Sequence, residues 1–523
     1  MGGLGETLDR VFSDCWRAGG LPHPVFLRLF IRLAPWSKCV PIWGFALFSS
    51  ARIPSLFRPH SRLWLLAAAC CLPVAVGCND SEMEFESNRV HAMALERSRD
   101  LPTEAALADV ELVLAELFGT PAEPAWPADR LTADQRALVS LERLQQASGS
   151  VESDAENVHR GLYTEHCVIC HGVSGSGAGP ASMYQWPYPR DFRAGVFKWK
   201  STQRDAKPTR DDLRRLLVNG IPGTPMPSFM TVTPSDREAL IDYLIYLSIR
   251  GEVERQLLAL AIDDLGYEDT PPTDDLRLRV TVTEQANLGR NEAGEIVFTD
   301  LTQSSRDAKP QAPDEGNQPE STAVEPTEGE LAVEEILQAV ASEWVQPQAS
   351  PVPPEQIPHA ADELHASIAR GAKLFSGQVA NCAGCHGPAG QGGLPLNDLD
   401  DWTKEFTTRI GITPTDADAV KPFRKAGALP PRIIEPRRLA GGVLRGGDDP
   451  ETLFRRIQHG IAGTPMPGIE LSESATGATG LTPGDVWDLV HYVQSLVQPT
   501  PKPSVRVVDD ENPSAAVETG VSL

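Results

Sequence analysis

Apolar residues recur at helical spacing in two stretches of the N-terminal half. Residues 103–118 and 132–145 place Leu and Val side chains three or four positions apart, and Gly119 stands where the first stretch would end. Thr132 and Gln135 occupy the positions of a capping box at the start of the second. These patterns predict amphipathic helices whose apolar faces pack inside the protein, in a role that is purely structural.

Another apolar stretch is unbroken and shows no helical periodicity. Residues 63–77 follow Arg58 and Arg62, are almost continuously apolar, and lead into Cys78 and a polar region. This profile is typical of a secretory signal sequence, and its length of about 15 residues falls short of the roughly 20 that a membrane-spanning helix needs. We therefore expect residues 63–78 to be a signal peptide and the protein to be periplasmic or otherwise exported.

The end of this stretch also resembles a bacterial lipoprotein processing site. In the run Ala75-Val76-Gly77-Cys78 the cysteine would become the lipidated first residue and would anchor the protein to the membrane. The alternative is a plain signal peptide in which Cys78 has no role. The preceding residues 1–62 show no pattern of a folding domain, and we expect an unstructured or mis-assigned extension.

A polar stretch near the middle of the chain lacks large apolar side chains almost completely. Residues 303–330 are rich in Pro, Glu, Gln, Ser, Thr and Asp, a composition that cannot bury a hydrophobic core. A short helix is expected near 331–345, and a proline-rich stretch follows at 347–358. Together these features predict a long, partly disordered linker over residues 251–360.

The regions on either side of this linker repeat the same landmarks in the same order. Cys-Val-Ile-Cys-His-Gly at 167–172 matches Cys-Ala-Gly-Cys-His-Gly at 382–387. Gly-Ile-Pro-Gly-Thr-Pro-Met-Pro at 220–227 and Gly-Ile-Ala-Gly-Thr-Pro-Met-Pro at 460–467 share seven of eight residues. An internal duplication of this kind predicts two homologous domains, which we call the first copy and the second copy.

Other landmarks extend the alignment of the two copies. Pro189-Arg190 aligns with Pro436-Arg437, and each copy closes on a helix opened by Thr-Pro-x-Asp. The second copy has an extra segment after its histidine, around residues 401–421. The expected division of the chain is an extension at 1–62, a signal peptide at 63–78, a helical region at 79–155, the first copy at 156–250, the linker at 251–360, the second copy at 361–498 and a disordered acidic tail at 499–523.

The chemistry-bearing motif in each copy is Cys-x-x-Cys-His, the attachment signature of c-type haem. Two thiols at that spacing can add to the vinyl groups of one haem, and the adjacent histidine then serves as the proximal ligand of the iron. The residues concerned are Cys167, Cys170 and His171 in the first copy, and Cys382, Cys385 and His386 in the second. We predict two covalent haem c groups per chain.

Two other interpretations of the cysteine pairs fit less well. A four-cysteine zinc site needs pairs about 15–20 residues apart, whereas these pairs are more than 200 residues apart in separate copies. A thioredoxin-like dithiol would leave the histidine in both copies unexplained.

An electron-carrying haem needs a second axial ligand, and a methionine sulfur raises the reduction potential. Met226 and Met466 occupy the same place in the repeated Gly-Thr-Pro-Met-Pro segment, where prolines restrict the backbone. Met183 and Met230 compete in the first copy but have no counterparts in the second. The duplication therefore selects Met226 and Met466.

Several further residues are weaker candidates. The main-chain carbonyls of Pro180 and Pro395 could accept the Nδ1 protons of the two histidine ligands and fix their tautomers. Four basic side chains could reach haem propionates or could equally be surface charges: Arg190, Lys198, Arg437 and Arg445. Three histidines lack partners in the opposite copy and are expected to be structural or solvated: His166, His459 and His491.

The net charge of −24 excludes one class of partner and favours another. A nucleic-acid binder needs a basic face to meet phosphates, so we expect no nucleic-acid partner. A redox protein with a basic docking face fits the charge better.

At the quoted motifs the chain resembles the class I cytochrome c family, with two such domains in tandem. The resemblance implies an all-α fold in which a helix before the haem motif crosses the closing helix; Gly161 and Gly371, with Tyr243 and Tyr492, suit that crossing. The arrangement is similar to diheme c-type subunits of membrane respiratory complexes.

Electron transfer without catalysis is therefore the expected function, at the outer face of the cytoplasmic membrane. A diheme peroxidase-like enzyme is the alternative, but it needs one domain without a sixth ligand, and both copies keep a methionine. A scaffold subunit with vestigial haems is a third possibility, and the two complete ligand sets argue against it.

Overall fold

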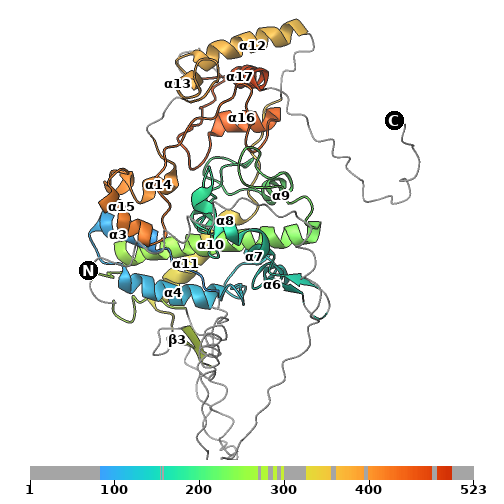
Figure 1. Cartoon of the computed structure of the whole chain (residues 1–523). Coiled ribbons are helices and arrows are strands. Elements are labelled where there is room, and N and C mark those ends of the chain that lie inside the picture. Colours follow the sequence, from blue (N-terminus) through green and yellow to red (C-terminus); the bar gives the residue numbers. More distant parts are fainter. Residues whose placement is uncertain are drawn as a thin grey trace, which may run out of the picture. The chain divides into compact units, whose positions relative to one another are not determined.

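The computed structural model describes most of the chain after the predicted signal peptide (Figure 1). The described residues are 83–153, 155, 158–268, 272–280, 287–290, 296–299, 325–354, 361–393, 398–473 and 480–497. The predicted extension at 1–62, the predicted signal peptide at 63–78 and the acidic tail at 499–523 lie outside them. Residues 303–324 of the polar linker also lie outside the described residues.

The all-α prediction is confirmed, because helices dominate the described residues. In the part of the chain that the structure describes, the strands form two antiparallel pairs, β1 (Glu152–Ser153) with β2 (His159–Arg160) and β3 (Asn287–Arg290) with β4 (Ile296–Thr299). Among the described residues, no helix is both long enough and apolar enough to cross a membrane.

The region before the first copy is helical. It contains α3 (Arg89–Arg99), α4 (Glu104–Phe118), α5 (Ala133–Arg136) and α6 (Leu141–Ala147). The capping box expected at Thr132 and Gln135 is present at the start of α5, where each residue bonds the main-chain N–H of the other.

The long helix α10 (Pro234–Asp263) organises the first copy and its surroundings. Thr233 caps its start by accepting a hydrogen bond from the Asp236 N–H, and Pro234 occupies the first turn, where its missing N–H costs nothing. The other elements of the copy are α7 (Leu162–His166), α8 (Val168–His171), η3 (Ser182–Tyr184), η4 (Phe192–Ala194) and α9 (Arg210–Asn219). Helices α4, α6, α9 and α11 (Glu328–Trp344) all pack against α10 (Figure 1).

The expected boundaries at residues 155 and 250 do not separate hydrophobic cores. One core runs from α3 and α4 through the first copy to α11, and α10 continues past 250 to Asp263. Val253 and Leu257 are buried in this continuation, so the residues after 250 belong to the same core as the first copy. Helix α11, at the place where a short linker helix is expected, buries Leu337 and donates a 2.9 Å hydrogen bond from Trp344 Nε1 to Glu252.

The second copy is built around two crossing helices, α12 (Ala361–Ser376) and α17 (Pro483–Leu496). Gly371 lies at the crossing, because a Cβ there would be 2.0 Å from the carbonyl oxygen of Asp488 and 2.8 Å from Cβ of Tyr492. Phe375 packs on the Tyr492 ring at a centroid distance of 5.2 Å. The copy also contains α13 (Cys382–His386) and α16 (Pro450–His459).

Among its described residues, the first copy has no long helix before the haem motif that could cross α10, so the expectation for Gly161 is wrong. Gly161 precedes a helix of five residues and has a φ of +76°, and a Cβ there would meet the main chain of Ser150 at 2.4 Å. Tyr163 packs instead on Tyr243 of α10, at a centroid distance of 4.8 Å. The helical region before the first copy takes the place of the missing helix, since α6 also packs on α10.

The extra segment of the second copy forms a small core of its own with α3. It contains α14 (Asp401–Glu405), η6 (Thr408–Ile410) and α15 (Ala417–Lys425). Phe406 and Phe423 of this segment are buried together with Ala94 of α3. Glu405 also accepts from His91 Nδ1 at 2.7 Å and pairs with Arg255 of α10 at 2.8 Å.

Candidate haem sites

The candidate proximal histidine of the first copy is held by a main-chain carbonyl. His171 ends the short helix α8 and donates from Nδ1 to the carbonyl oxygen of Arg190 at 3.0 Å, while its ring stacks on Phe192 at 4.5 Å. A carbonyl can only accept, so Nδ1 carries the proton and Nε2 keeps its lone pair for a metal ion. Burial lowers the pKa of His171 to about 4, with the charge of Arg190 acting in the same direction, so the ring stays neutral.

The second copy repeats this arrangement. His386 Nδ1 donates to the carbonyl oxygen of Arg437 at 2.8 Å, and burial lowers the pKa of this histidine too. Arg190 and Arg437 are the equivalent residues of the duplicated Pro-Arg pairs. Both histidines are therefore neutral rings with Nε2 available.

The expectation that Pro180 and Pro395 accept these protons is corrected for the first copy. The neighbours of Pro180 bond the main chain of α8, with Gly179 N–H donating to Cys170 and Ala181 N–H to Ile169, so this segment runs along the helix and not beneath the ring. Pro395 lies outside the described residues, but the acceptor for His386 is the Arg437 carbonyl.

A glycine brings each carbonyl to its histidine. At Gly177, where φ is +72°, a Cβ would come within 2.8 Å of the Pro189 carbonyl and 2.9 Å of the Asp191 nitrogen. The equivalent Gly392, with a φ of +65°, is equally close to the main chain of Arg438. Glycine at these positions lets the Pro-Arg segment approach the haem motif directly.

The four cysteines of the motifs form no disulfide with one another. Burial, with the neighbouring Cys170, raises the pKa of Cys167 to about 12, and burial raises that of Cys382 to about 11. Surroundings that disfavour a thiolate are compatible with an uncharged thioether sulfur.

The two methionine loops have the same hydrogen-bond pattern. In the first copy, Thr224 donates from its hydroxyl to the Ile221 carbonyl at 2.8 Å and accepts from the Met226 N–H at 3.2 Å. In the second, Thr464 makes the same two bonds with Ile461 and Met466, at 2.8 and 3.2 Å. The repeated sequence thus folds into two matching loops with methionine at the same position.

The competing methionines of the first copy are exposed. Met183 and Met230 are 43% and 52% exposed, and neither lines the cavity that contains the motif. Met226 and Met466 do line it, which agrees with their selection as the axial pair; their bond to iron stays a prediction.

Both sets of candidate ligands line a single cavity of about 1100 Å³. This volume exceeds the roughly 300–1,000 Å³ of a pocket for one small molecule. Its walls include both cysteine pairs, both candidate proximal histidines and both candidate axial methionines, with apolar side chains such as Phe197, Leu213 and Leu489. The cavity therefore combines an apolar lining with the candidate donor atoms for two haem groups.

Basic side chains also line this cavity, including the four candidate propionate partners. Among the described residues, the four candidate propionate partners have no carboxylate within 4.0 Å of their charged nitrogens: Arg190, Lys198, Arg437 and Arg445. Burial lowers the pKa of Lys198 to about 7, with Arg190 acting in the same direction, and burial next to Arg437 lowers that of Arg445 to about 10. Anionic propionates would compensate these cations, so the residues fit haem at this point as well.

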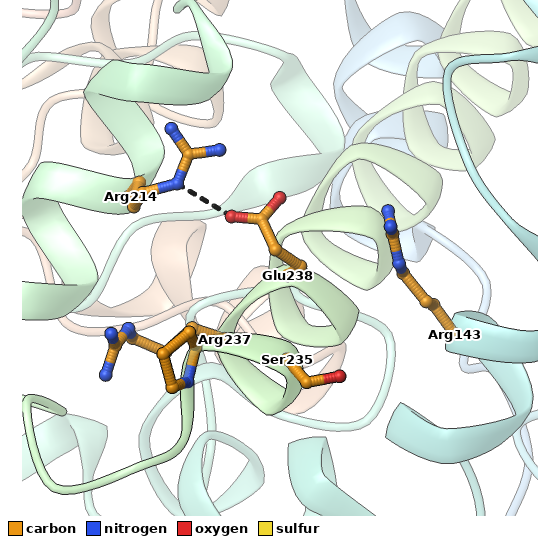
Figure 2. Close-up of a pocket in the computed structure, with 6 residues that line it drawn as sticks. Arg143, Arg214, Ser235, Arg237 and Glu238 are labelled. Atoms are coloured by element: carbon orange, nitrogen blue, oxygen red, sulfur yellow. Dashed lines mark hydrogen bonds and ion pairs between the residues drawn. The ribbon is translucent and has the colours of Figure 1, made fainter. Parts of the chain in front are cut away.

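Another cavity, of about 230 Å³, lies at the start of α10 and holds none of the candidate residues. Figure 2 shows Arg143 and Arg214 on opposite sides of Glu238. Arg214 pairs with Glu238 at 2.7 Å, and Arg143 contacts Asp242 at 3.5 Å. Because both arginines already pair with carboxylates of the protein, we assign this cavity a structural role and no ligand.

The sequence did not indicate the roles of the Arg190 and Arg437 carbonyls. The alignment of Pro189-Arg190 with Pro436-Arg437 indicated that these residues matter, but it led us to predict a role for the arginine side chains and not for the main-chain carbonyls. The side chains line the cavity as expected, while the main-chain oxygens hold the histidines.

Part of the chain matches a known protein family. The cytochrome c family model matches residues 160–248 and 368–497. Among solved structures, a chain of the reducing HAO-like protein complex of Kuenenia stuttgartiensis is similar, with 19% sequence identity, a TM-score of 0.36, and coverage of 67% of this chain and 100% of that chain. No curated protein sequence matches the chain.

The family match covers both Cys-x-x-Cys-His motifs and both methionine loops. It agrees with the helical fold, the neutral histidines and the cavity. Residues 160–248 and 368–497 are therefore two tandem domains of the cytochrome c family, whose cofactor is covalently bound haem c and whose role is electron transfer.

Proposed function

We propose that the protein is a diheme electron carrier that passes electrons between respiratory-chain partners at the outer face of the cytoplasmic membrane. The observation that carries the proposal is the shared cavity, which is lined by a complete ligand set from each copy. Haem supplies the one-electron redox chemistry when bound, and the protein supplies its orientation, its axial ligands and its electrostatic surroundings.

The chain's own residues support a carrier over an enzyme. A peroxidase-like site requires an iron position left open to substrate, whereas each copy here presents a methionine from a loop of the same geometry. The neutral histidine on the opposite side is held by the same type of carbonyl bond in both copies. Two equally closed sites favour transfer of electrons without bond chemistry.

The proposed partner and location rest on the sequence. The net charge of −24 favours a redox partner with a basic docking face, such as a subunit of a membrane respiratory complex. Residues 63–78 support export, and lipid at Cys78 would hold the protein at the membrane.

A reduced-minus-oxidised spectrum with a pyridine haem assay, repeated under carbon monoxide, tests this proposal. We expect two covalent haems per chain and no spectral change with carbon monoxide in either. A haem that reacts with carbon monoxide in the unmodified protein would overturn the carrier assignment and make peroxide consumption the next assay.

A further inference from the structure

The two domains contact each other through equivalent residues. The guanidinium of Arg437 lies 2.5 Å from the position that a Cβ on Gly223 would take, and that of Arg190 lies 3.3 Å from the same position on Gly463. Arg190 is equivalent to Arg437, and Gly223 to Gly463. Reciprocal contacts of this kind are the pattern of a two-fold interface between the copies.

Another contact joins two residues at the same position of the duplication. Trp199 of the first domain lies against Gly446 of the second, where a Cβ would be 2.7 Å from the ring. The two residues each follow the aligned segment that ends at Lys198 or Arg445. Equivalent residues meet in this way on a two-fold axis, so the domains face each other with their methionine loops at the interface.

An arginine of the first domain holds the methionine loop of the second. Arg204 donates from Nη1 to the carbonyl oxygen of Met466 at 2.8 Å and from Nη2 to that of Thr464 at 3.0 Å. In the opposite direction, Arg445 Nη2 donates to the carbonyl oxygen of Gly223, in the methionine loop of the first domain, at 3.2 Å. Each loop is therefore bonded by the other domain.

Arg204 belongs to a segment that the second domain lacks. Ten residues separate Lys198 from the helix cap Thr209, whereas three separate Arg445 from the equivalent cap Asp449. The longer segment is fastened by the Lys200 ammonium, which donates to the Arg204 carbonyl at 2.7 Å. The duplication has thus diverged where the first domain reaches the second haem site.

We propose that Arg204 is a positioning residue for Met466, so that the first domain controls the axial ligand of the haem in the second. The inference rests on the proposed function, in which Met466 is that ligand. A guanidinium that donates to two carbonyls fixes the loop in orientation as well as in place, and the donor is charged, which strengthens both bonds. Lysine keeps the charge but cannot reproduce the planar fork.

The test compares the holoprotein with the variants Arg204→Gln and Arg204→Lys. The readouts are the charge-transfer band of methionine-ligated ferric haem, the two reduction potentials and the rate of carbon monoxide binding. We expect both variants to weaken that band in one haem and to shift the equilibrium of that haem from its methionine-bound form toward its open form about tenfold, the factor that loss of one hydrogen bond to a charged donor corresponds to, so that carbon monoxide binding becomes detectable there. Arg279→Gln is the control, because Arg279 also donates to a carbonyl, that of Asp274, at an exposed position away from the cavity.

Combination with methionine variants identifies the affected haem. The Met226→Ala protein should bind one carbon monoxide per chain, at the haem of the first domain. Adding Arg204→Gln should raise this number to two, under conditions in which the haem of the second domain is otherwise closed to carbon monoxide. Added to Met466→Ala, it should leave the number at one. A change in the haem of the first domain would contradict the inference.

Two other results separate this inference from the proposed function. A shift of potential in Arg204→Gln alone, with an unchanged methionine band and a normal Arg204→Lys, would mean that Arg204 acts only through its charge and would overturn the inference. Carbon monoxide binding to the haem of the second domain before any substitution would instead show that Met466 is no ligand, and would overturn the proposed function.

Discussion

His171 and His386 each donate a hydrogen bond from Nδ1 to the main-chain carbonyl oxygen of an arginine. This bond leaves Nε2 as the nitrogen that can bind iron. The duplicated motif predicted the histidines, the cysteines and the methionines as candidate haem residues, and the structure brings them to one cavity. It could not predict the carbonyl acceptors, because a main-chain oxygen leaves no residue-type signal. Pro180 was the wrong choice, since its neighbours bond the main chain of α8.

Replacing Met226 by Ala should open one iron. The thioether sulfur that closes the site and raises the potential is removed, so the variant should bind one carbon monoxide per chain and show a lower potential for one haem. Carbon monoxide difference spectra and a redox titration measure both effects. Met230→Ala is the control because that side chain is exposed, and an unchanged Met226→Ala protein would show that the axial assignment is wrong.

Helices α12 and α17 cross as the family resemblance implies, whereas the first domain has no helix of similar length before its haem motif. Sequence landmarks around Gly161 and Gly371 are similar, but the packing partner of the first domain comes from the region before it, which shares no landmark with the second. The extent of α10 was missed for a related reason. Its continuation past residue 250 is buried by α11, which follows much later in the chain.

A Gly371→Ala change should destabilise the second domain by about 1–3 kcal/mol, the usual cost of overpacking a core. The new Cβ would lie 2.0 Å from the Asp488 carbonyl oxygen, which belongs to a helix backbone and cannot move alone. Chemical unfolding followed by haem absorbance measures the effect. Gly484→Ala is a matched control in α17, because its nearest neighbour would be 3.7 Å away, and equal stabilities would contradict the observed crossing.

The second domain also contacts, through side chains, helices that precede it in the chain. The extra segment of the second domain packs on α3, and Glu405 joins it to His91 and Arg255. Burial alone would raise the pKa of Glu405, but the charge of Arg255 and the bond from His91 outweigh it and lower the pKa to about 2. The sequence indicated the extra segment but not its partner, because the contact joins residues more than 300 positions apart.

The Glu405 contact should weaken in acid. A carboxylate whose pKa is lower in the folded state stabilises the fold fully above its unfolded pKa of roughly 4.3, and this contribution disappears as the pH falls toward 2. Its size is on the order of 3 kcal/mol. Unfolding free energies measured between pH 5 and about 2 should therefore fall more steeply in the unmodified protein than in Glu405→Gln, and parallel curves would contradict the assignment.

The most direct test of the central claim is an anaerobic titration of the holoprotein with a one-electron reductant, followed by transfer to a one-electron acceptor. Two haems with closed coordination should take up two electrons per chain and return both to the acceptor, with no consumption of hydrogen peroxide when it is added. Uptake of a single electron, or oxidation of the reduced protein by catalytic turnover of peroxide, would contradict a diheme electron carrier.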